Sequence, residues 1–176
     1  MRNPEAIRNA ADLRLEFDQG FAQPASVARD DAVSFIGLEI DGDAYALRVG
    51  DISGLFVDRR IVGLPGPLPE LLGIAGLRGG IVAVYSVRRL LGYEEAGGAA
   101  PRWLAHAGKG PSLGLAFHDF GGHFRVPKAS VLPSSEGSRP HVFEAVLGDD
   151  RRWGVIDIAS VLTTVRRRND LFAKEP

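Results

Sequence analysis

Apolar residues recur with helical spacing near the N-terminus of the chain. Asn3-Pro4-Glu5 offers a capping side chain, a proline at the first helical position and an acidic residue in the first turn. The apolar residues that follow are three or four positions apart until Gly20: Ala6, Ala10, Leu13 and Phe17. We therefore predict a helix over residues 1–21, packed on its own domain or docked on a partner, and a linker over residues 22–32.

From residue 33 the apolar residues alternate with polar ones, as they do in strands. Asp41-Gly42 fits a tight turn between two such strands, which predicts a hairpin. The alternating residues are Ile36, Leu38 and Ile40 before the turn and Tyr45, Leu47 and Val49 after it. A third strand is predicted from Ile52 to Val57, although Gly54 weakens its middle. Three prolines then predict a loop: Pro65, Pro67 and Pro69.

The segment from Gly73 to Gly92, GIAGLRGGIVAVYSVRRLLG, contains a strand, a turn, a second strand and a helical end. Paired glycines at Gly79-Gly80 permit the positive φ angles that a short hairpin turn needs. Ile81 to Tyr85 is a β-branched and aromatic run that is typical of a strand covered on both faces. Gly92 fits a left-handed cap of the helical end. The guanidinium of Arg78 can stay in water at the turn and face a partner.

Two internal repeats indicate that the chain carries two similar copies. The first repeat consists of Ile36-Gly37-Leu38 with Leu47-Arg48-Val49, and it recurs as Leu113-Gly114-Leu115 with Phe124-Arg125-Val126. The second repeat consists of Val84-Tyr85-Ser86-Val87 with Leu90-Leu91, and it recurs as Val155-Ile156-Asp157-Ile158 with Val161-Leu162. Each copy reads as hairpin, loop, hairpin and short closing helix, over about residues 33–92 and 112–162. A mobile connector over residues 93–111 joins them, and a polar tail over residues 163–176 follows. This pattern predicts a mainly β fold with two small antiparallel barrels side by side.

Composition narrows the class of protein. The 21 basic and 22 acidic residues nearly balance, so no overall field favours nucleic acid or an anionic membrane as a partner. The chain has no cysteine, which excludes disulfides, zinc–thiolate sites and thiol catalysis. No run approaches the roughly 18 apolar residues of a membrane span, and the N-terminus lacks an apolar signal core. We expect a cytoplasmic protein without direct membrane insertion.

The histidines are the candidates for metal or acid–base chemistry. His118 and His123 flank Asp119-Phe120-Gly121-Gly122, which we interpret as a solvated turn, because no His-x-x-x-His helix or paired carboxylate accompanies them. No nucleophile elbow, phosphate-binding loop or dinucleotide fingerprint occurs. We therefore predict no catalytic residue, no metal and no cofactor. The remaining alternative is a small β-barrel ligand-binding protein or metalloenzyme that uses His118, Asp119 and His123.

Two clusters of arginines and one aspartate are the remaining charged features of the sequence. Arg151-Arg152 and Arg166-Arg167-Arg168 are interpreted as a hairpin tip and a solvated tail, because no recognised nucleic-acid module accompanies them. Asp157 stands where a strand passes into a helix, so its carboxylate is expected to cap that helix.

The segment from Gly73 to Gly92 resembles the signature of CheW-like domains, the coupling modules of bacterial chemosensory arrays, roughly GVINLRG-x-IVPVIDLRxxLG. The matching positions are Gly73, Leu77, Arg78, Gly79, Ile81, Val82, Val84, Arg88, Leu91 and Gly92. Gly76, Ala83 and Ser86 stand where the family shows Asn, Pro and Asp. The resemblance extends over about residues 33–162. It implies two SH3-like five-stranded barrels that share an apolar seam.

The resemblance also implies a function and a site. CheW-like adaptors hold the regulatory domain of a CheA-like histidine kinase and the cytoplasmic tip of a chemoreceptor together, without catalysis. Position by position, it nominates partner-binding residues at the turn and in the third strand: Arg78, Leu77, Gly79, Ile52, Ser53, Gly54 and Leu55. Gly54 stands where the family has a Glu, so the acidic residue expected near Arg78 is absent. A divergent scaffold for a pathway other than chemotaxis is the alternative within this family.

Overall fold

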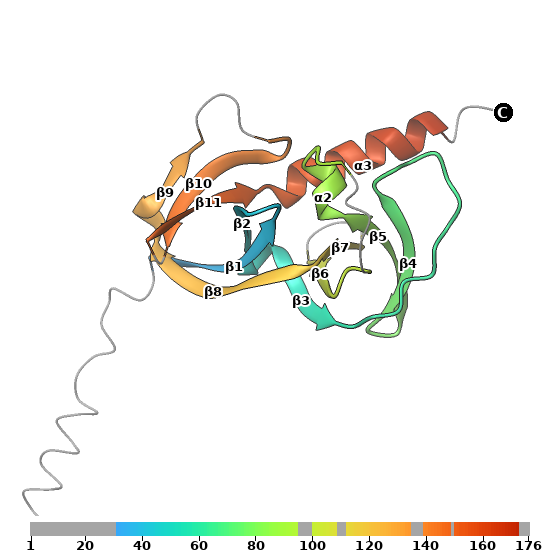
Figure 1. Cartoon of the computed structure of the whole chain (residues 1–176), viewed down its shortest axis with the longest axis horizontal. Coiled ribbons are helices and arrows are strands. Elements are labelled where there is room, and N and C mark those ends of the chain that lie inside the picture. The colour runs from blue at the N-terminus through green and yellow to red at the C-terminus, as the bar shows by residue number, and fades with distance from the viewer. Residues whose placement is uncertain (1–30, 95–99, 109–111, 135–138, 149, 173–176) are drawn as a thin grey trace, which may run out of the picture. The chain divides into compact units, whose positions relative to one another are not determined.

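The computed structural model describes residues 31–94, 100–108, 112–134, 139–148 and 150–172 (Figure 1). Contacts divide the chain into two units, Met1–Ala32 and Val33–Pro176. The predicted N-terminal helix and almost all of the predicted linker lie outside the described residues. The described residues from Val33 onward belong to the second unit.

The described residues form two β-sheets, which confirms the mainly β class (Figure 1). The six-stranded sheet has the order β8-β1-β2-β11-β10-β9, with β1 (Ala32–Ile40), β2 (Asp43–Arg48), β8 (Asp119–Pro127), β9 (Val131–Pro133), β10 (Val142–Gly148) and β11 (Arg151–Ile156). The five-stranded sheet has the order β3-β6-β7-β5-β4, with β3 (Ile52–Val57), β4 (Leu71–Leu77), β5 (Gly80–Ser86), β6 (Trp103–Ala107) and β7 (Leu113–Phe117). Two α-helices, α2 (Val87–Leu90) and α3 (Ile158–Phe172), follow β5 and β11.

The two sheets do not correspond to the two sequence copies. The chain builds β1 and β2 in the six-stranded sheet, crosses to the other sheet for β3 to β7, and returns for β8 to β11. Each predicted copy, 33–92 and 112–162, therefore supplies strands to both sheets. One parallel pair in each sheet, β2 with β11 and β5 with β7, joins strands that are distant in the sequence. Such long-range pairing leaves no local signal in the sequence.

The repeat formed by a hairpin and its closing helix is present twice in the structure. The β4–β5 hairpin leads into α2, and the β10–β11 hairpin leads into α3. The side chains of Ser86 and Asp157 accept hydrogen bonds from the first turns of these helices, so the expected cap at Asp157 is confirmed. Gly92, at φ 78°, ends α2 in the left-handed conformation that was predicted.

The other repeat does not form a second hairpin. β1 pairs with β2, but β7 pairs with β5 and β6, while β8 belongs to the other sheet. The chain bends at His118, and Asp119-Phe120-Gly121-Gly122 lies within β8, so the interpretation of these four residues as a turn is wrong. Gly121 allows a close approach, because a Cβ at this position would lie 2.8 Å from the ring of Trp153.

Two segments predicted as irregular are regular. The predicted connector contains β6, which pairs with β3 on one side and β7 on the other. The predicted polar tail is helical as far as Phe172, because α3 continues its buried stripe of Ile158, Val161 and Val165 beyond the expected end. In the described chain, α3 is thus a helix of 15 residues rather than a short closing helix.

Three apolar clusters stabilise the second unit. One lies within the six-stranded sheet around Phe35, Phe124 and Trp153, and one lies within the five-stranded sheet around Val84 and Leu104. The largest combines both sheets and both helices, with Leu38, Leu47, Leu91, Leu115 and Val161 among its least exposed members. This shared core fixes the two sheets against each other and so fixes the positions of the turns between their strands.

Candidate partner-binding site

The turn between β4 and β5 presents Arg78. Leu77 pairs with Gly80, so Arg78 and Gly79 form a two-residue hairpin turn, with φ angles of 50° and 80°. The positive φ angles fall on Arg78 and Gly79, and not on the pair Gly79-Gly80 that the sequence suggested. A left-handed conformation costs a non-glycine residue roughly 1–2 kcal/mol. An exposed arginine held in such a conformation marks this turn as a functional candidate.

Arg78 reaches across to the opposite edge of the same sheet. Its Nη2 donates a hydrogen bond to the carbonyl oxygen of Ser53 in β3. Its guanidinium carbon lies 6.0 Å from the centre of the Phe56 ring, also in β3. Since β3 and β4 are the two edge strands of the five-stranded sheet, the turn joins its edges through a side chain. Arg78 therefore lies against β3, the third strand of the chain.

The predicted site residues differ in their exposure. Arg78 and Gly79 are exposed, and Ser53 and Gly54 are half-buried. Leu77 is only 3% exposed and packs in the cluster of the five-stranded sheet, so it supports the turn from beneath and does not present a side chain to a partner. Ile52 and Leu55 are half-buried and pack against the shared core.

Gly54 lies directly beside Arg78. A Cβ on Gly54 would be 3.1 Å from Nη2 of Arg78 and 3.1 Å from the Phe56 ring. The register between β3 and β6 shifts between Ile52 and Gly54, which is the bulge that a strand glycine often marks. The position at which the resemblance implies an acidic residue is thus next to the guanidinium, and in this chain it carries no side chain.

His106 in β6 contacts Ser53 in the neighbouring strand β3. Ser53 Oγ lies 2.7 Å from Nδ1 of His106, and Nε2 of His106 lies 2.5 Å from Oγ of Ser112. Burial lowers the pKa of His106, and the positive charge of Arg78 lowers it further. This environment favours the neutral imidazole, which contacts Ser53 through Nδ1.

Two residues of this surface escaped the sequence analysis. Phe56 appeared only as a strand residue, because nothing local links it to Arg78. Ile81 is 76% exposed, although the sequence predicted a strand covered on both faces. Its partner across the hairpin is Gly76, which provides no side chain to cover it. Strand alternation alone would not have found Ile81, since Tyr85, on the same face of β5, is buried.

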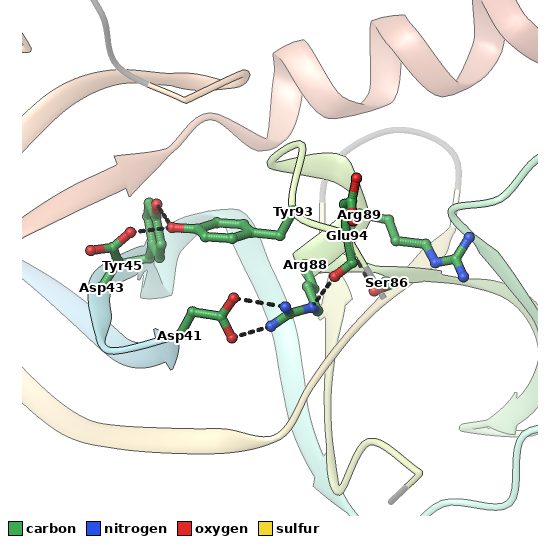
Figure 2. Close-up of polar contacts among 8 residues, drawn as sticks. All are labelled: Asp41, Asp43, Tyr45, Ser86, Arg88, Arg89, Tyr93 and Glu94. Carbon is green, nitrogen blue, oxygen red and sulfur yellow. Dashed lines mark hydrogen bonds and ion pairs between the residues drawn. The ribbon is translucent and has the colours of Figure 1, made fainter. Parts of the chain in front are cut away.

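A polar network fastens the β1–β2 turn to the end of α2 (Figure 2). Arg88 binds both carboxylate oxygens of Asp41, with Nη2 2.7 Å from Oδ2, and its Nε donates to the carbonyl of Glu94 at 2.5 Å. The hydrogen bonds with Arg88 lower the pKa of Asp41 and raise that of Arg88. Arg88, which matches the family signature, therefore links the two sheets and does not point at a partner.

Two tyrosines extend this network (Figure 2). The hydroxyl of Tyr93 donates to Asp43, so the hydroxyl of Tyr45, 2.6 Å away, donates to Tyr93. Burial raises the pKa of Tyr93, and its bond to Asp43 raises it further. The guanidinium carbon of Arg139 lies 3.8 Å from the centre of the Tyr93 ring. These contacts are structural support for the sheets that carry the site.

The C-terminal part of α3 is also fastened to the five-stranded sheet. Arg168 forms an ion pair with Glu70, which is 2% exposed and directly precedes β4. Arg168 is exposed, as the sequence suggested, but it lies in a helix and is ion-paired, so the interpretation of this segment as a tail is wrong. Because a buried carboxylate requires a partner, this ion pair fixes the end of the proline-containing loop.

The alternative metal site finds no support. His118, Asp119 and His123 are exposed. Among the residues that the structure describes, no group of three or more His, Cys, Asp or Glu side chains could hold a metal ion. In the same part of the chain, no helix has the length and apolar character required to cross a membrane.

Comparisons with known proteins agree with the resemblance seen in the sequence. A model of the CheW-like domain matches residues 34–166. The fold is similar to the crystal structure of the scaffolding protein TtCheW from Thermoanaerobacter tengcongensis, with a TM-score of 0.65, 19% sequence identity, and coverage of 72% of this chain and 89% of that chain. No curated protein matches the chain. The family match, which extends over most of the chain, shows that this protein belongs to the CheW-like domain family.

Proposed function

We propose that this protein is a non-catalytic cytoplasmic adaptor that couples the cytoplasmic tip of a chemoreceptor to the regulatory domain of a CheA-like histidine kinase. The observation that carries the proposal is the placement of Arg78. In a chain of the CheW-like family, Arg78 is exposed on a two-residue turn and lies against edge strand β3. We assign receptor binding to this turn with Ser53, Gly54 and Ile81.

An adaptor needs a second surface, and the six-stranded sheet offers one. Leu132 and Leu147 are 60% and 62% exposed on edge strand β9 and its neighbour β10. Leu132 lies opposite Ala145, two residues from Leu147, so both side chains are on one face of the sheet. Phe143 of β10 is 57% exposed as well. Exposed apolar groups of this size mark interaction surfaces, and we assign kinase binding to them.

The test is pairwise binding of the full chain to a receptor-tip fragment and to a kinase regulatory domain from the same genome. We expect Arg78→Ala to weaken receptor binding about tenfold, because arginines anchor interfaces, with little change in melting temperature. Leu147→Asp should weaken kinase binding instead. Each variant serves as the control for the other.

The outcomes separate the candidate functions. Loss of neither interaction in either variant would contradict both surface assignments. Kinase binding without receptor binding by the unmodified chain would instead indicate a CheW-like scaffold for a pathway other than chemotaxis. Binding of neither partner would contradict the proposed function itself.

A further inference from the structure

The two proposed binding surfaces lie on different sheets. The turn that carries Arg78 belongs to the five-stranded sheet, and the exposed Leu132 and Leu147 belong to the six-stranded sheet. The distance and the angle between two bound partners therefore depend on how the sheets are oriented relative to each other. Contacts that fix this orientation can affect the function of an adaptor without touching either partner.

Apolar packing and polar contacts constrain this orientation in different ways. The shared core joins the sheets through apolar side chains such as Leu47 and Leu115. The attraction between such groups depends on the buried area and has little directionality. A guanidinium that binds both oxygens of a carboxylate, by contrast, fixes the distance and the relative orientation of the two groups. Polar contacts between the sheets are therefore the candidates for setting their angle.

Arg88 and Asp41 form such a contact between the sheets (Figure 2). Asp41 belongs to the β1–β2 turn of the six-stranded sheet, and Arg88 belongs to α2, which directly follows β5 of the five-stranded sheet. Nη1 and Nη2 of Arg88 both donate to the carboxylate of Asp41, the second over 2.7 Å. The side chain of Arg88 is only 19% exposed, so water competes little for these bonds.

Both members of this ion pair are held in place within their own part of the fold. Asp41 has a φ angle of 54° in a turn whose Gly42 carbonyl accepts a hydrogen bond from Arg151 of β11 at 2.9 Å. Nε of Arg88 donates to the carbonyl oxygen of Glu94 at 2.5 Å, which fixes the direction of the guanidinium. An ion pair between positioned groups loses less side-chain entropy than one between mobile groups, so it can hold a defined geometry.

Tyr93 makes a second contact between the sheets, beside the first (Figure 2). Its hydroxyl donates to Asp43 at the start of β2 and lies 2.6 Å from the hydroxyl of Tyr45. The guanidinium carbon of Arg139 lies 3.8 Å from the centre of its ring. Two contacts at neighbouring positions oppose rotation of the sheets as well as their separation.

The second sequence copy has no equivalent of the ion pair. In the repeat of strand and helix, Ser86-Val87-Arg88 corresponds to Asp157-Ile158-Ala159, so an alanine occupies the position of Arg88. A different contact joins the sheets at Trp103 of β6 and Phe120 of β8, whose ring centres are 4.8 Å apart. Aromatic pairs tolerate a range of offsets and angles, so the polar contacts are the more exact constraint.

We propose that the contacts of Arg88 with Asp41 and of Tyr93 with Asp43, together called the inter-sheet clamp, fix the angle between the two sheets and thereby position the receptor relative to the kinase. Arg88 and Tyr93 are positioning residues, because they lie outside both proposed binding surfaces. The inference rests on the proposed function, since the receptor and the kinase are the partners that the angle positions. Loss of the clamp should leave each pairwise interaction intact and impair the response of the kinase to the receptor.

The first measurement needs no partner. Because the chain has no cysteine, Gly76→Cys in β4 and Arg125→Cys in β8 place one spin label on each sheet. Both positions are exposed, and a Cβ on Gly76 would meet no atom within 4 Å. Double electron–electron resonance then measures the distribution of distances between the labels in the full chain. We expect a narrow distribution without further changes and a shifted or broader one in Arg88→Met/Tyr93→Phe.

Arg102→Met is the matched control for this measurement. Nε of Arg102 lies 3.5 Å from a carboxylate oxygen of Asp58, and the two residues adjoin β6 and β3 of the same sheet. This variant removes an ion pair that does not connect the sheets, so the distance distribution should stay the same. A thermal melt checks that the variants fold. If the Arg88/Tyr93 double variant does not fold, Asp41→Asn, which tolerates the positive φ, decides the question in the same way.

The second measurement connects the angle to the function. The affinities of the full-length variants for the receptor-tip fragment and the kinase regulatory domain are compared with the effect of the receptor on autophosphorylation of the complete kinase. We expect Arg88→Met/Tyr93→Phe to change each affinity by less than about threefold. The receptor-dependent change in kinase activity should fall about tenfold. Arg102→Met should affect neither quantity.

The outcomes separate the clamp from the proposed function. An unchanged distance distribution without the clamp would overturn the inference, and so would a changed distribution with unchanged kinase control. Loss of a pairwise interaction in a folded variant would place Arg88 or Tyr93 at a binding surface and overturn their assignment as positioning residues. Binding of neither partner by the unmodified chain would overturn the proposed function, whereas the distance measurement would still decide whether the clamp fixes the sheets.

Discussion

Two ionisable residues of this protein, Arg78 and His141, adopt a backbone conformation that is unfavourable for residues other than glycine. Arg78 adopts a left-handed conformation that favours glycine, and His141 does the same at φ 64°. His141 is 8% exposed, and its Nδ1 lies 2.8 Å from Oγ of Ser160 in α3. Burial lowers the pKa of His141, Arg168 lowers it further, and Asp157 opposes both effects. The folded protein therefore favours the neutral imidazole.

This environment predicts a pH dependence of stability at the residue scale. Since the pKa of His141 is lower in the folded state than the ordinary value of 6.5, the unfolded chain binds more protons in mildly acidic solution. The free energy of unfolding should fall as the pH drops below about 6.5. His141→Asn, which tolerates the positive φ, should reduce this dependence. Urea denaturation at several pH values from 7 to 5 measures it.

The exposed His123 provides the control for this measurement. His123→Asn should leave the pH dependence between pH 7 and 5 as it is in the unmodified chain. If His141→Asn also left it unchanged, the buried imidazole would not be a source of the acid sensitivity.

At the scale of elements, the sequence correctly predicted those turns and helix caps that depend only on residues close together in the chain. The Asp41-Gly42 turn, the glycine cap of α2 and the Asp157 cap of α3 all depend on residues within a few positions of one another. The strand β6 was missed because its alanines and histidine resemble a connector, and because its stability comes from pairing with distant β3 and β7. The length of α3 was missed for a similar reason, since Arg168 binds Glu70, 98 positions away.

In the candidate site, too, the sequence predicted local features and missed contacts between distant segments. Arg78 and its turn were recognisable from the segment Gly73 to Gly92 alone. The neighbourhood of Arg78 was not, because Phe56 and His106 reach the site through the pairing of β3 with β6. The burial of Leu77 was also unpredictable from the motif, which does not distinguish a residue that supports a turn from one that contacts a partner.

The ion pair between Arg168 of α3 and the buried Glu70 leads to a prediction about stability. Arg168→Met should lower the stability by about 1–3 kcal/mol, because it leaves the carboxylate of the buried Glu70 without its cation, and the half-exposed position of Arg168 reduces the cost. For a chain of this size the melting temperature should fall by roughly 3–10 °C. Calorimetry or circular dichroism measures the shift.

Arg167→Met is the matched control, since Arg167 is exposed on the same helix. Its effect on the melting temperature should be small. In the double variant Glu70→Gln/Arg168→Met, much of the lost stability should return, because the buried charge is removed. Equal melting temperatures of Arg167→Met and Arg168→Met would contradict the role of this ion pair.

At the scale of the whole molecule, the unit from Val33 onward has its own core. Its three apolar clusters contain residues of both sheets and both described α-helices. Removal of residues 1–30 should therefore leave a folded protein with a cooperative thermal transition. Circular dichroism and a thermal melt check this expectation, and a non-cooperative melt would contradict it.

The same deletion distinguishes the two roles expected for the predicted N-terminal helix. If the helix packs on its own domain, the deletion lowers the melting temperature and leaves the binding of both partners intact. If it docks on a partner, the melting temperature is unchanged and one interaction is lost. We expect the first result, because Ala6 and Ala10 are too small to anchor a helix in the groove of a partner.

The central claim is that one molecule of this protein holds two partners at once. Sedimentation velocity of the full chain mixed with the receptor-tip fragment and the kinase regulatory domain tests this claim directly. We predict a species that contains all three proteins and is absent from every pairwise mixture, and Arg78→Ala should deplete it by releasing the receptor fragment. Mutually exclusive binding, in which each added partner displaces the other, would contradict the account.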